Sequence, residues 1–259
     1  MEAKVISISN QKGGVGKTTT AINLAAALGK LGKNSLVIDL DPQANATIGL
    51  GIDRSILLGD GDTIFDVLSK KSNIEDTIKK STAEGVDVVP SSINLSGFDL
   101  YANKNFSSNN ELLLKESIES IKNKYDYIII DCPPSLGLLV KNALVASNSV
   151  LITVQSEYYA LEGLAQLINT VWSIKKLFNK KLKIEGVLMT MYNNNYNMSR
   201  EIYNEVKRIL GESLFKTKIT RNIKLSESPS FGKSIFDYDD KSNGAENYLL
   251  LAQEVLNGR

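Results

Sequence analysis

The sequence predicts an α/β fold, a doubly wound and mostly parallel central sheet with helices on both faces. Short apolar runs alternate with longer amphipathic stretches along the whole chain. The short runs are apolar on both faces, which is typical of strands buried in a parallel sheet between helices. A glycine-rich turn joins the first of these strands to the first helix, as expected of a phosphate-binding member of this class.

The elements follow one another in strand–helix order. The expected strands are Lys4–Ser9, Ser35–Asp39, Val86–Pro90, Tyr127–Asp131, Ser149–Val154, Ile184–Met189 and Leu214–Lys216. The expected helices are Lys17–Leu31, Ile64–Ser69, Asn110–Lys122, Leu138–Ala146, Leu161–Phe178, Ser199–Leu210 and Ala245–Leu256. Ligands of such sheets lie beyond the carboxyl ends of the strands, so motifs that follow strand ends can share one crevice.

The turn between the first strand and the first helix reads Gln11-Lys12-Gly13-Gly14-Val15-Gly16-Lys17-Thr18. It nearly matches the P-loop template G-x-x-x-x-G-K-[ST], with glutamine in place of the first glycine. Backbone N–H groups of such a loop and the positive end of the helix dipole bind phosphate, and Lys17 adds a full charge. A flexible glycine loop with a solvated lysine would not need this order of strand, loop and helix. We therefore expect a P-loop NTPase.

Three further motifs are typical of a site that binds a nucleotide together with Mg²⁺. Thr18 can ligate Mg²⁺ through its hydroxyl, and Thr19 can reach the α-phosphate. Asp39 and Asp41 end the second strand, where two carboxylates beside a phosphate cradle suit a Mg²⁺ shell and a positioned water. Asp131 follows an apolar strand and is typical of a Walker B carboxylate, although a strand-terminal aspartate is often only a turn residue. The expected cofactors are ATP and Mg²⁺, with metal ligands Thr18, Asp39 and Asp131.

The amino-acid composition excludes several kinds of site and mechanism. The 259 residues carry 30 Lys and Arg against 29 Asp and Glu, a net charge of +1, so nucleic-acid binding would need a local patch. With one cysteine, Cys132, and no histidine, the chain excludes an internal disulfide, a Cys–His zinc site and a histidine base. We expect one cytoplasmic P-loop ATPase domain over residues 1–259, without a separate N-terminal DNA-binding domain, and Cys132 as a packing residue.

Several blocks together carry a family resemblance. The run from Lys12 to Thr19 resembles the deviant Walker A motif of the MinD/ParA group of ATPases, with its extra lysine. The further matching blocks are Asp39–Gln43 with Asn45–Thr47, Asp131–Leu136, Gln155–Gly163, Arg221–Gly232, Asp237–Asp239 and Ser242–Glu246. The chain thus resembles a ParA/Soj-type partition ATPase nearly from end to end.

This resemblance implies a mechanism and roles for single residues. ATP would close two subunits face to face, and Lys12 would reach the partner's phosphates, much as an arginine finger does. Lys17 would hold the β- and γ-phosphates in its own subunit, and Asp41 would position the attacking water. Asn222 would contact the adenine. Loop residues Gly13, Gly14, Val15, Gly16, Thr18 and Thr19 would complete the nucleotide site.

The resemblance also implies partners. The ATP dimer would bind double-stranded DNA without sequence preference on the nucleoid, and a ParB-like centromere-binding protein would stimulate hydrolysis. The candidate DNA contacts are Arg200, Arg221, Lys224 and Lys233. Thr220 stands where the family often has proline, and Asn194, Asn195 and Tyr196 occupy the place of a usual Arg-Thr pair, so Arg200 would have to replace that arginine. Whether the cargo is a plasmid or a chromosome stays open, as does the role of the polar stretch Asn94–Asn110.

Three other functions compete. A MinD-like membrane-cycling ATPase needs a basic amphipathic C-terminal helix, whereas the tail from Tyr248 carries Glu254 and only Arg259 as a base, which indicates a packing helix and no membrane partner. A redox ATPase of the nitrogenase iron-protein type needs two cysteines per subunit. A cargo-docking scaffold would bind ATP with little turnover, but the presence of Lys12, Lys17, Asp41 and Asp131 favours slow hydrolysis.

Overall fold

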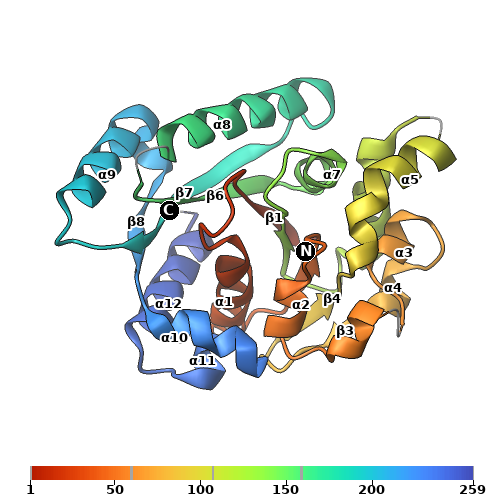
Figure 1. Ribbon diagram of the computed structural model, residues 1–259, viewed down its shortest axis with the longest axis horizontal. Coiled ribbons are helices and arrows are strands. Elements are labelled where there is room, and N and C mark those ends of the chain that lie inside the picture. Colours follow the sequence, from red (N-terminus) through yellow and green to blue (C-terminus); the bar gives the residue numbers. More distant parts are fainter. Residues whose placement is uncertain (1, 59–60, 107, 158–159, 259) are drawn as a thin grey trace.

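An eight-stranded sheet forms the centre of the molecule in the computed structural model, which describes residues 2–58, 61–106, 108–157 and 160–258. The strand order is β3-β4-β2-β5-β1-β6-β7-β8, and every pair is parallel except β3 with β4. The strands are β1 (Lys4–Ser9), β2 (Ser35–Asp39), β3 (Lys79–Lys80), β4 (Val86–Val89), β5 (Tyr127–Asp131), β6 (Ser149–Gln155), β7 (Lys183–Tyr192) and β8 (Leu214–Thr220). The predicted doubly wound, mostly parallel fold is confirmed (Figure 1).

Helices cover both faces of this sheet (Figure 1). One face carries α1 (Lys17–Lys30), α2 (Asn45–Gly49), α10 (Ile223–Glu227), α11 (Ile235–Tyr238) and α12 (Asn243–Leu256). The other face carries α3 (Ile64–Leu68), α4 (Ile74–Thr77), α5 (Phe98–Asn105), α6 (Leu113–Ile118), α7 (Leu138–Ala146), α8 (Ala160–Leu177) and α9 (Asn197–Leu210). Short 3₁₀ turns span Arg54–Leu58, Ile93–Gly97, Asn110–Leu112, Glu119–Ile121, Gly211–Ser213 and Ser228–Phe231.

Alternation along the strands divides the core into two layers. In β1, Val5 faces the α7 side, whereas Ile6 and Ile8 face α1. In β5, Ile128 and Ile130 face the first layer and Ile129 faces the second. Because β1, β2 and β5 pair in parallel, their carboxyl ends lie at one edge of the sheet.

The structure revises several predicted boundaries. Strand β4 ends at Val89, before the predicted Pro90, because proline has no N–H for the ladder. Strands β7 and β8 run longer than predicted, to Tyr192 and Thr220, and both are paired at those residues. The predicted single helix Asn110–Lys122 is instead a short α-helix between two 3₁₀ turns. The polar stretch Asn94–Asn110 contains α5, whose Phe98 and Ala102 are buried.

The C-terminal helix packs along α1 and β8, as predicted for a packing helix. Its buried side chains include Tyr248, Leu251 and Val255. The Tyr248 hydroxyl lies 3.1 Å from the Thr20 hydroxyl of α1. Glu254 accepts hydrogen bonds from two backbone N–H groups of the edge strand β8 and so covers that edge.

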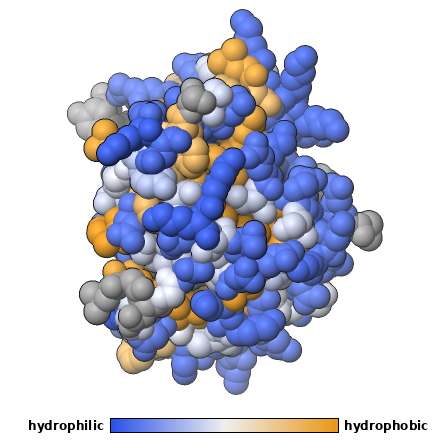
Figure 2. Space-filling view, turned by 90° about the vertical axis from the view of Figure 1, so that its right-hand side faces the viewer, coloured by the Kyte–Doolittle hydropathy of each residue, from blue (hydrophilic) through white to orange (hydrophobic). Residues whose placement is uncertain are grey.

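The face that carries α3, α4 and α5 is mostly hydrophilic, with apolar side chains in small areas between polar ones (Figure 2). One of the exposed apolar residues is Leu100 of α5, at 80% exposure. Across the described residues, no helix combines the length and the apolar character that crossing a bilayer requires.

Gly29 of α1 allows a close approach to the turn before β4. A Cβ at this position would lie 2.2 Å from the backbone oxygen of Glu84. We expect Gly29→Ala to lower the free energy of unfolding by about 1–3 kcal/mol, because backbone on both sides must shift. The measurement is the midpoint of urea denaturation. Gly97→Ala is the control, since no atom lies within 4 Å of its added Cβ, and equal effects of the two substitutions would contradict this explanation.

Candidate nucleotide-binding site

The loop between β1 and α1 leaves room for phosphate. Gly14 and Gly16 have φ angles of 73° and 81°, left-handed values that favour glycine. Nothing lies within 4 Å of a Cβ added at Gly13 or Gly14, so this side of the loop is open. No side chain caps the amino end of α1 at Gly16. The N–H groups at the start of α1 are therefore available to an anion.

Side chains from neighbouring strands fix this loop. Thr190 of β7 donates its hydroxyl to the backbone oxygen of Val15 at 2.9 Å. Asn10 donates its amide to the oxygen of Thr153 in β6 at 2.6 Å and accepts from the N–H of Lys12 at 3.0 Å. The cradle is therefore built on the ends of β6 and β7 as well as on β1, which gives it a defined shape without a ligand.

Lys17 is buried inside the loop. Its Nζ donates to the backbone oxygen of Lys12 at 2.9 Å, which places the ammonium under the cradle. Burial lowers the pKa of Lys17, while the charges of Asp131 and Asp41 act to raise it. The predicted phosphate-binding lysine and two of the predicted carboxylates are thus close together in the structure.

Asp39 at the end of β2 is fully buried and already satisfied. Its carboxylate accepts from the N–H of Asp41 at 3.0 Å, and from the N–H and hydroxyl of Thr47 at 2.8 and 2.7 Å. Burial raises the pKa of Asp39 to about 6, although these hydrogen bonds favour the charged form. In this arrangement Asp39 holds α2 against β2, and its oxygens are engaged by the protein.

Asp131 lies beside Asp39, since the two residues pair across β2 and β5. Both carboxylate oxygens of Asp131 are buried, and neither has a hydrogen-bond partner of acceptable geometry among the described residues. Burial and the neighbouring Asp39 raise the pKa of Asp131 well above its ordinary value, and the Thr18 hydroxyl acts in the opposite direction. A buried carboxylate without a partner is the donor that a cation would satisfy.

The donor set suits Mg²⁺ better than a metal held by protein alone. Within the described residues, no group of three or more Asp, Glu, Cys or His could hold a metal. Mg²⁺ is commonly bound by one or two carboxylates, substrate phosphates and water. Thr18 and Asp131 would hold the ion at the cradle, where it would neutralise the buried carboxylates and the phosphates.

Asp41 follows β2 and is 8% exposed. Its Oδ1 accepts from the N–H of Gln43 at 2.9 Å, and its backbone oxygen accepts from the Ser91 hydroxyl at 2.6 Å. Its charge adds to the raised pKa of both Asp39 and Asp131, so all three predicted carboxylates share one pocket of negative charge. Among the described residues, no hydrogen bond engages its other carboxylate oxygen, which is therefore the one available to a water molecule.

Lys12 lies outside this cluster. Its ammonium pairs with Glu157, which lies just after β6, and the two side chains are 46% and 47% exposed. Within one subunit Lys12 is therefore turned to a surface carboxylate of its own chain. Glu157 lies in one of the sequence blocks described above, and Tyr158 and Tyr159 of that block lie outside the described residues.

The remaining predicted residues lie after β7 and β8. Asn222 is half-buried and caps α10 by accepting from the N–H of Lys224 at 2.9 Å. Arg221 is exposed, and its N–H meets the oxygen of Tyr192, which brings the ends of β7 and β8 together.

The other basic candidates differ in how far they are engaged. Lys224 forms an ion pair with Asp239, which raises the pKa of the lysine. Arg200 donates to Asn197 on its own helix. Lys233 is exposed, and no ion pair of its ammonium is found in the described part of the chain. Of the four predicted DNA contacts, Arg221 and Lys233 have the cationic groups with the fewest hydrogen bonds and ion pairs to described residues.

Sequence reasoning did not single out several residues that shape the site. Thr47 and Ser91 hold the Asp39 and Asp41 segment, and Thr190 holds the loop. Ser91 and Thr190 lie just after or at the carboxyl end of a strand, which is the signal that could have marked them, whereas Thr47 lies in α2, within the sequence block Asn45–Thr47. Cys132 is fully buried in the core, as predicted for a packing residue, and burial raises its pKa.

Comparison with known proteins decides the family. A family model described as an AAA domain matches residues 3–184. The sporulation initiation inhibitor protein Soj of Bacillus subtilis is 51% identical over 252 residues, which cover 97% of this chain and 98% of Soj. The chromosome partitioning protein ParA of Myxococcus xanthus is 45% identical, over 98% of this chain and 88% of that protein. This chain belongs to the ParA/Soj family of chromosome-partitioning ATPases. The family and its ATPase activity are thus those that the sequence motifs predicted.

Solved structures agree with this assignment. Cobyrinic acid a,c-diamide synthase of Mycobacterium smegmatis, solved with a bound ATP analog and magnesium, has a TM-score of 0.85 at 30% identity, over 98% of this chain and 95% of that one. The cell division ATPase MinD of Pyrococcus furiosus has a TM-score of 0.78 at 27% identity, over 98% and 99% of the two chains. The fold of this chain is therefore shared by a diamide synthase and by a cell division ATPase.

The two neighbouring aspartates should respond in opposite ways to loss of charge. Without nucleotide and Mg²⁺, we expect Asp131→Asn to raise the free energy of unfolding by about 1 kcal/mol, since it removes a buried charge that repels Asp39 and Asp41 and accepts no well-formed hydrogen bond from the described residues. Asp39→Asn should lower it by about 1–3 kcal/mol, because an amide nitrogen cannot accept from Asp41 or Thr47. Urea denaturation of both variants is the measurement, and equal signs would contradict the difference between the two carboxylates.

Proposed function

We propose that residues 1–259 act as one P-loop ATPase domain that forms a face-to-face dimer on ATP and, in that state, binds double-stranded DNA without sequence preference. A ParB-like protein stimulates hydrolysis and so releases the dimer from the nucleoid. The observation that carries this proposal is that two lysines of one loop lie in different environments. Lys17 is buried under the cradle, whereas Lys12 is half exposed and turned away from it.

Lys12 is suited to a second subunit. Its bond to Glu157 is an exposed ion pair, a kind that typically contributes no more than about 1 kcal/mol. A partner's phosphates would offer a stronger and less solvated site for the same ammonium. Lys17 stays with the β- and γ-phosphates of its own subunit. Hydrolysis therefore depends on closure, because the second positive charge arrives only with the partner.

The carboxylates have separate tasks in this proposal. Thr18 and Asp131 hold Mg²⁺, with Asp39 as the predicted further metal residue next to them in the sheet. Asp41 uses one oxygen for the turn at Gln43 and orients the attacking water with the other. Orientation is enough for this role, since phosphoryl transfer depends mainly on positioning. Asn222, at the start of α10, contacts the adenine with its amide nitrogen, since its oxygen caps the helix.

In this proposal, DNA binding depends on bringing together the small basic patches of two subunits. Arg221 and Lys233 have the least engaged cationic groups, Lys224 and Arg200 stand close to their own partners, and one subunit has a net charge of only +1. Affinity for DNA falls with salt by about 0.9 per neutralised phosphate in a log–log plot. Two subunits joined by ATP present twice as many contacts, so a dimer can bind where a monomer does not.

Asp41→Ala separates nucleotide binding from hydrolysis. We expect this variant to form a stable dimer with ATP, and to bind duplex DNA at least about tenfold more tightly with ATP than with ADP or no nucleotide, because it cannot position the water that ends the ATP state. Light scattering follows dimerisation, and fluorescence anisotropy of labelled duplex follows DNA binding.

Lys17→Ala is the control. This variant should not bind the nucleotide and should therefore lose both ATP-dependent dimerisation and DNA binding. DNA affinity that is equal with and without ATP would refute ATP-switched DNA binding. An ATP dimer that ignores DNA would place the cargo contact elsewhere and leave the ATPase assignment intact.

Releasing Lys12 should favour the dimer. We expect Glu157→Gln to strengthen ATP-dependent dimerisation about two- to fivefold, which corresponds to roughly 0.4–1 kcal/mol, because the lysine no longer has to leave an ion pair. The dimerisation constant is measured by analytical ultracentrifugation with ATP in an Asp41→Ala background. Glu162→Gln, an exposed glutamate at the start of α8, is the control and should change nothing. A weaker or unchanged dimer would show that Glu157 does not restrain Lys12.

A further inference from the structure

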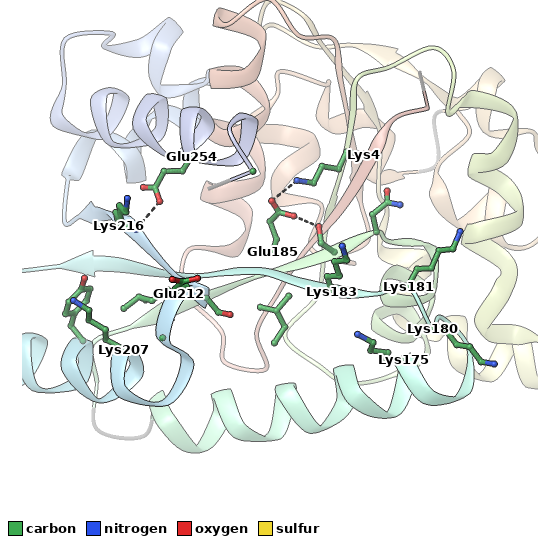
Figure 3. Close-up of a pocket in the computed structure, with 18 residues that line it drawn as sticks. Lys4, Lys175, Lys180, Lys181, Lys183, Glu185, Lys207, Glu212, Lys216 and Glu254 are labelled. Carbon is green, nitrogen blue, oxygen red and sulfur yellow. Dashed lines mark hydrogen bonds and ion pairs between the residues drawn. The ribbon is translucent and has the colours of Figure 1, made fainter.

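A large groove lies at the edge of the sheet opposite the nucleotide site. It has a volume of about 1190 Å³ and is lined by the amino ends of β1, β6, β7 and β8 and by the carboxyl ends of α8, α9 and α12 (Figure 3). The P-loop follows the carboxyl end of β1, so the length of a strand separates the two sites. The groove therefore takes no part in the nucleotide chemistry described above.

Lysines dominate the rim of this amino-edge groove. Among the described residues that line it, seven are lysines and three are glutamates. Lys180 and Lys181 come from the connection between α8 and β7, Lys183 from the start of β7, and Lys207 from the last turn of α9 (Figure 3). All four are exposed. Four separate points of positive charge therefore surround one hollow.

Two of the three glutamates of the groove are engaged by groups other than the side chains of these four lysines. Glu185 is engaged by the ammonium of Lys4 at 2.8 Å and by the Ser149 hydroxyl. Glu254 accepts the backbone N–H groups of Lys216 and Thr217 at 3.0 and 2.7 Å. No ion pair of Lys180, Lys181, Lys183 or Lys207 occurs within the parts of the chain that the structure describes.

Helix dipoles explain only part of this charge. A lysine in the last turn of a helix is stabilised by the negative end of the dipole, which accounts for Lys207 of α9. Lys181 and Lys183 lie beyond the end of α8 and gain little from it, because the effect falls off within the last turn. An excess of positive charge therefore remains for an external anion.

The floor of the groove is partly apolar. Of the apolar lining residues, Ile184 and Tyr203 are half-buried, and Leu214 is nearly buried. The volume exceeds the roughly 300–1,000 Å³ of small-molecule pockets, which indicates a longer occupant. Strand addition at β8 is prevented, because Glu254 already takes the N–H groups of Lys216 and Thr217. The occupant must be recognised through its side chains.

We propose that the amino-edge groove docks an acidic peptide segment of a partner protein, with carboxylates on the lysine rim and apolar side chains on the floor. A DNA duplex fits this shape less well, because it offers phosphates but no apolar side chain to a concave floor. Opposite charges would also speed encounter between the two proteins. Since the groove is far from the nucleotide cradle, the segment binds with or without ATP, and this docking is independent of the function proposed above.

A synthetic peptide provides the direct test. The probe is a fluorescein-labelled peptide in which glutamate alternates with leucine and phenylalanine, and its binding to the full chain is followed by anisotropy without nucleotide. We expect salt-sensitive binding that weakens at least about tenfold in the double variant Lys181→Glu with Lys207→Glu. Carbodiimide cross-linking and mass spectrometry should join peptide carboxylates to Lys181 or Lys183.

Matched controls make the test decisive. The double variant Lys104→Glu with Lys115→Glu makes the same charge change on exposed lysines of α5 and α6 and should bind the peptide normally. A peptide with glutamine for glutamate should not bind, and a polyglutamate of equal length should bind more weakly. Equal loss in both double variants, absence of peptide binding, or a groove variant that loses duplex DNA but keeps the peptide would overturn the proposal.

The two proposals fail independently. Lys181→Glu with Lys207→Glu should still form the ATP-dependent dimer and bind DNA, since neither residue lies at the carboxyl edge of the sheet. Thermal unfolding followed by circular dichroism shows whether the double variants fold. If the double variant Lys181→Glu with Lys207→Glu lost ATP-dependent DNA binding but still bound the peptide, the groove would be a DNA-binding site. The docking proposal would then be wrong.

Discussion

The juxtaposition of Asp39 and Asp131 across β2 and β5 is the constraint on which the nucleotide site depends. Two fully buried carboxylates side by side repel each other, and burial raises the pKa of each. Thr47 and Asp41 bind Asp39, whereas no described residue makes a hydrogen bond of acceptable geometry to the oxygens of Asp131. Lys17 supplies one nearby positive charge. The apo protein thus carries an electrostatic strain that a magnesium nucleotide would relieve.

Carboxylates gather at the carboxyl edge of the sheet, and lysines gather at its amino edge. At the carboxyl edge, the amino end of α1 and a buried lysine face three carboxylates, and the arrangement suits a phosphate with its cation. At the amino edge, the carboxyl ends of α8, α9 and α12 converge below a rim of lysines. Parallel connectivity produces this separation, because the parallel strands all point one way and the crossover helices that join them run the opposite way. Nucleotide chemistry and protein docking can therefore be kept apart on a small domain.

Sequence patterns located the long elements and missed most of the short ones for a physical reason. Strands β1, β2 and β5 were predicted with their observed bounds because they are buried on both faces. Helices α2, α4, α10 and α11 have four or five residues, too few to show a helical period. Helix α5 was hidden in a polar stretch because only Phe98 and Ala102 of its residues are buried. The edge strand β3 has two residues and no pattern at all.

The sequence by itself determined the phosphate loop, the positions of the acidic residues at strand ends and the family, because each of these is a local arrangement of residue types. Only the tertiary structure decided how those residues are engaged. It pairs Lys12 with Glu157, separated by 145 positions, and it distinguishes Asp131 from Asp39 by their partners. It also gathers Lys181 and Lys207 at one groove. Such contacts depend on chain crossings that no local pattern encodes, since hydrogen bonds and ion pairs form only where packing brings distant segments within a few ångströms.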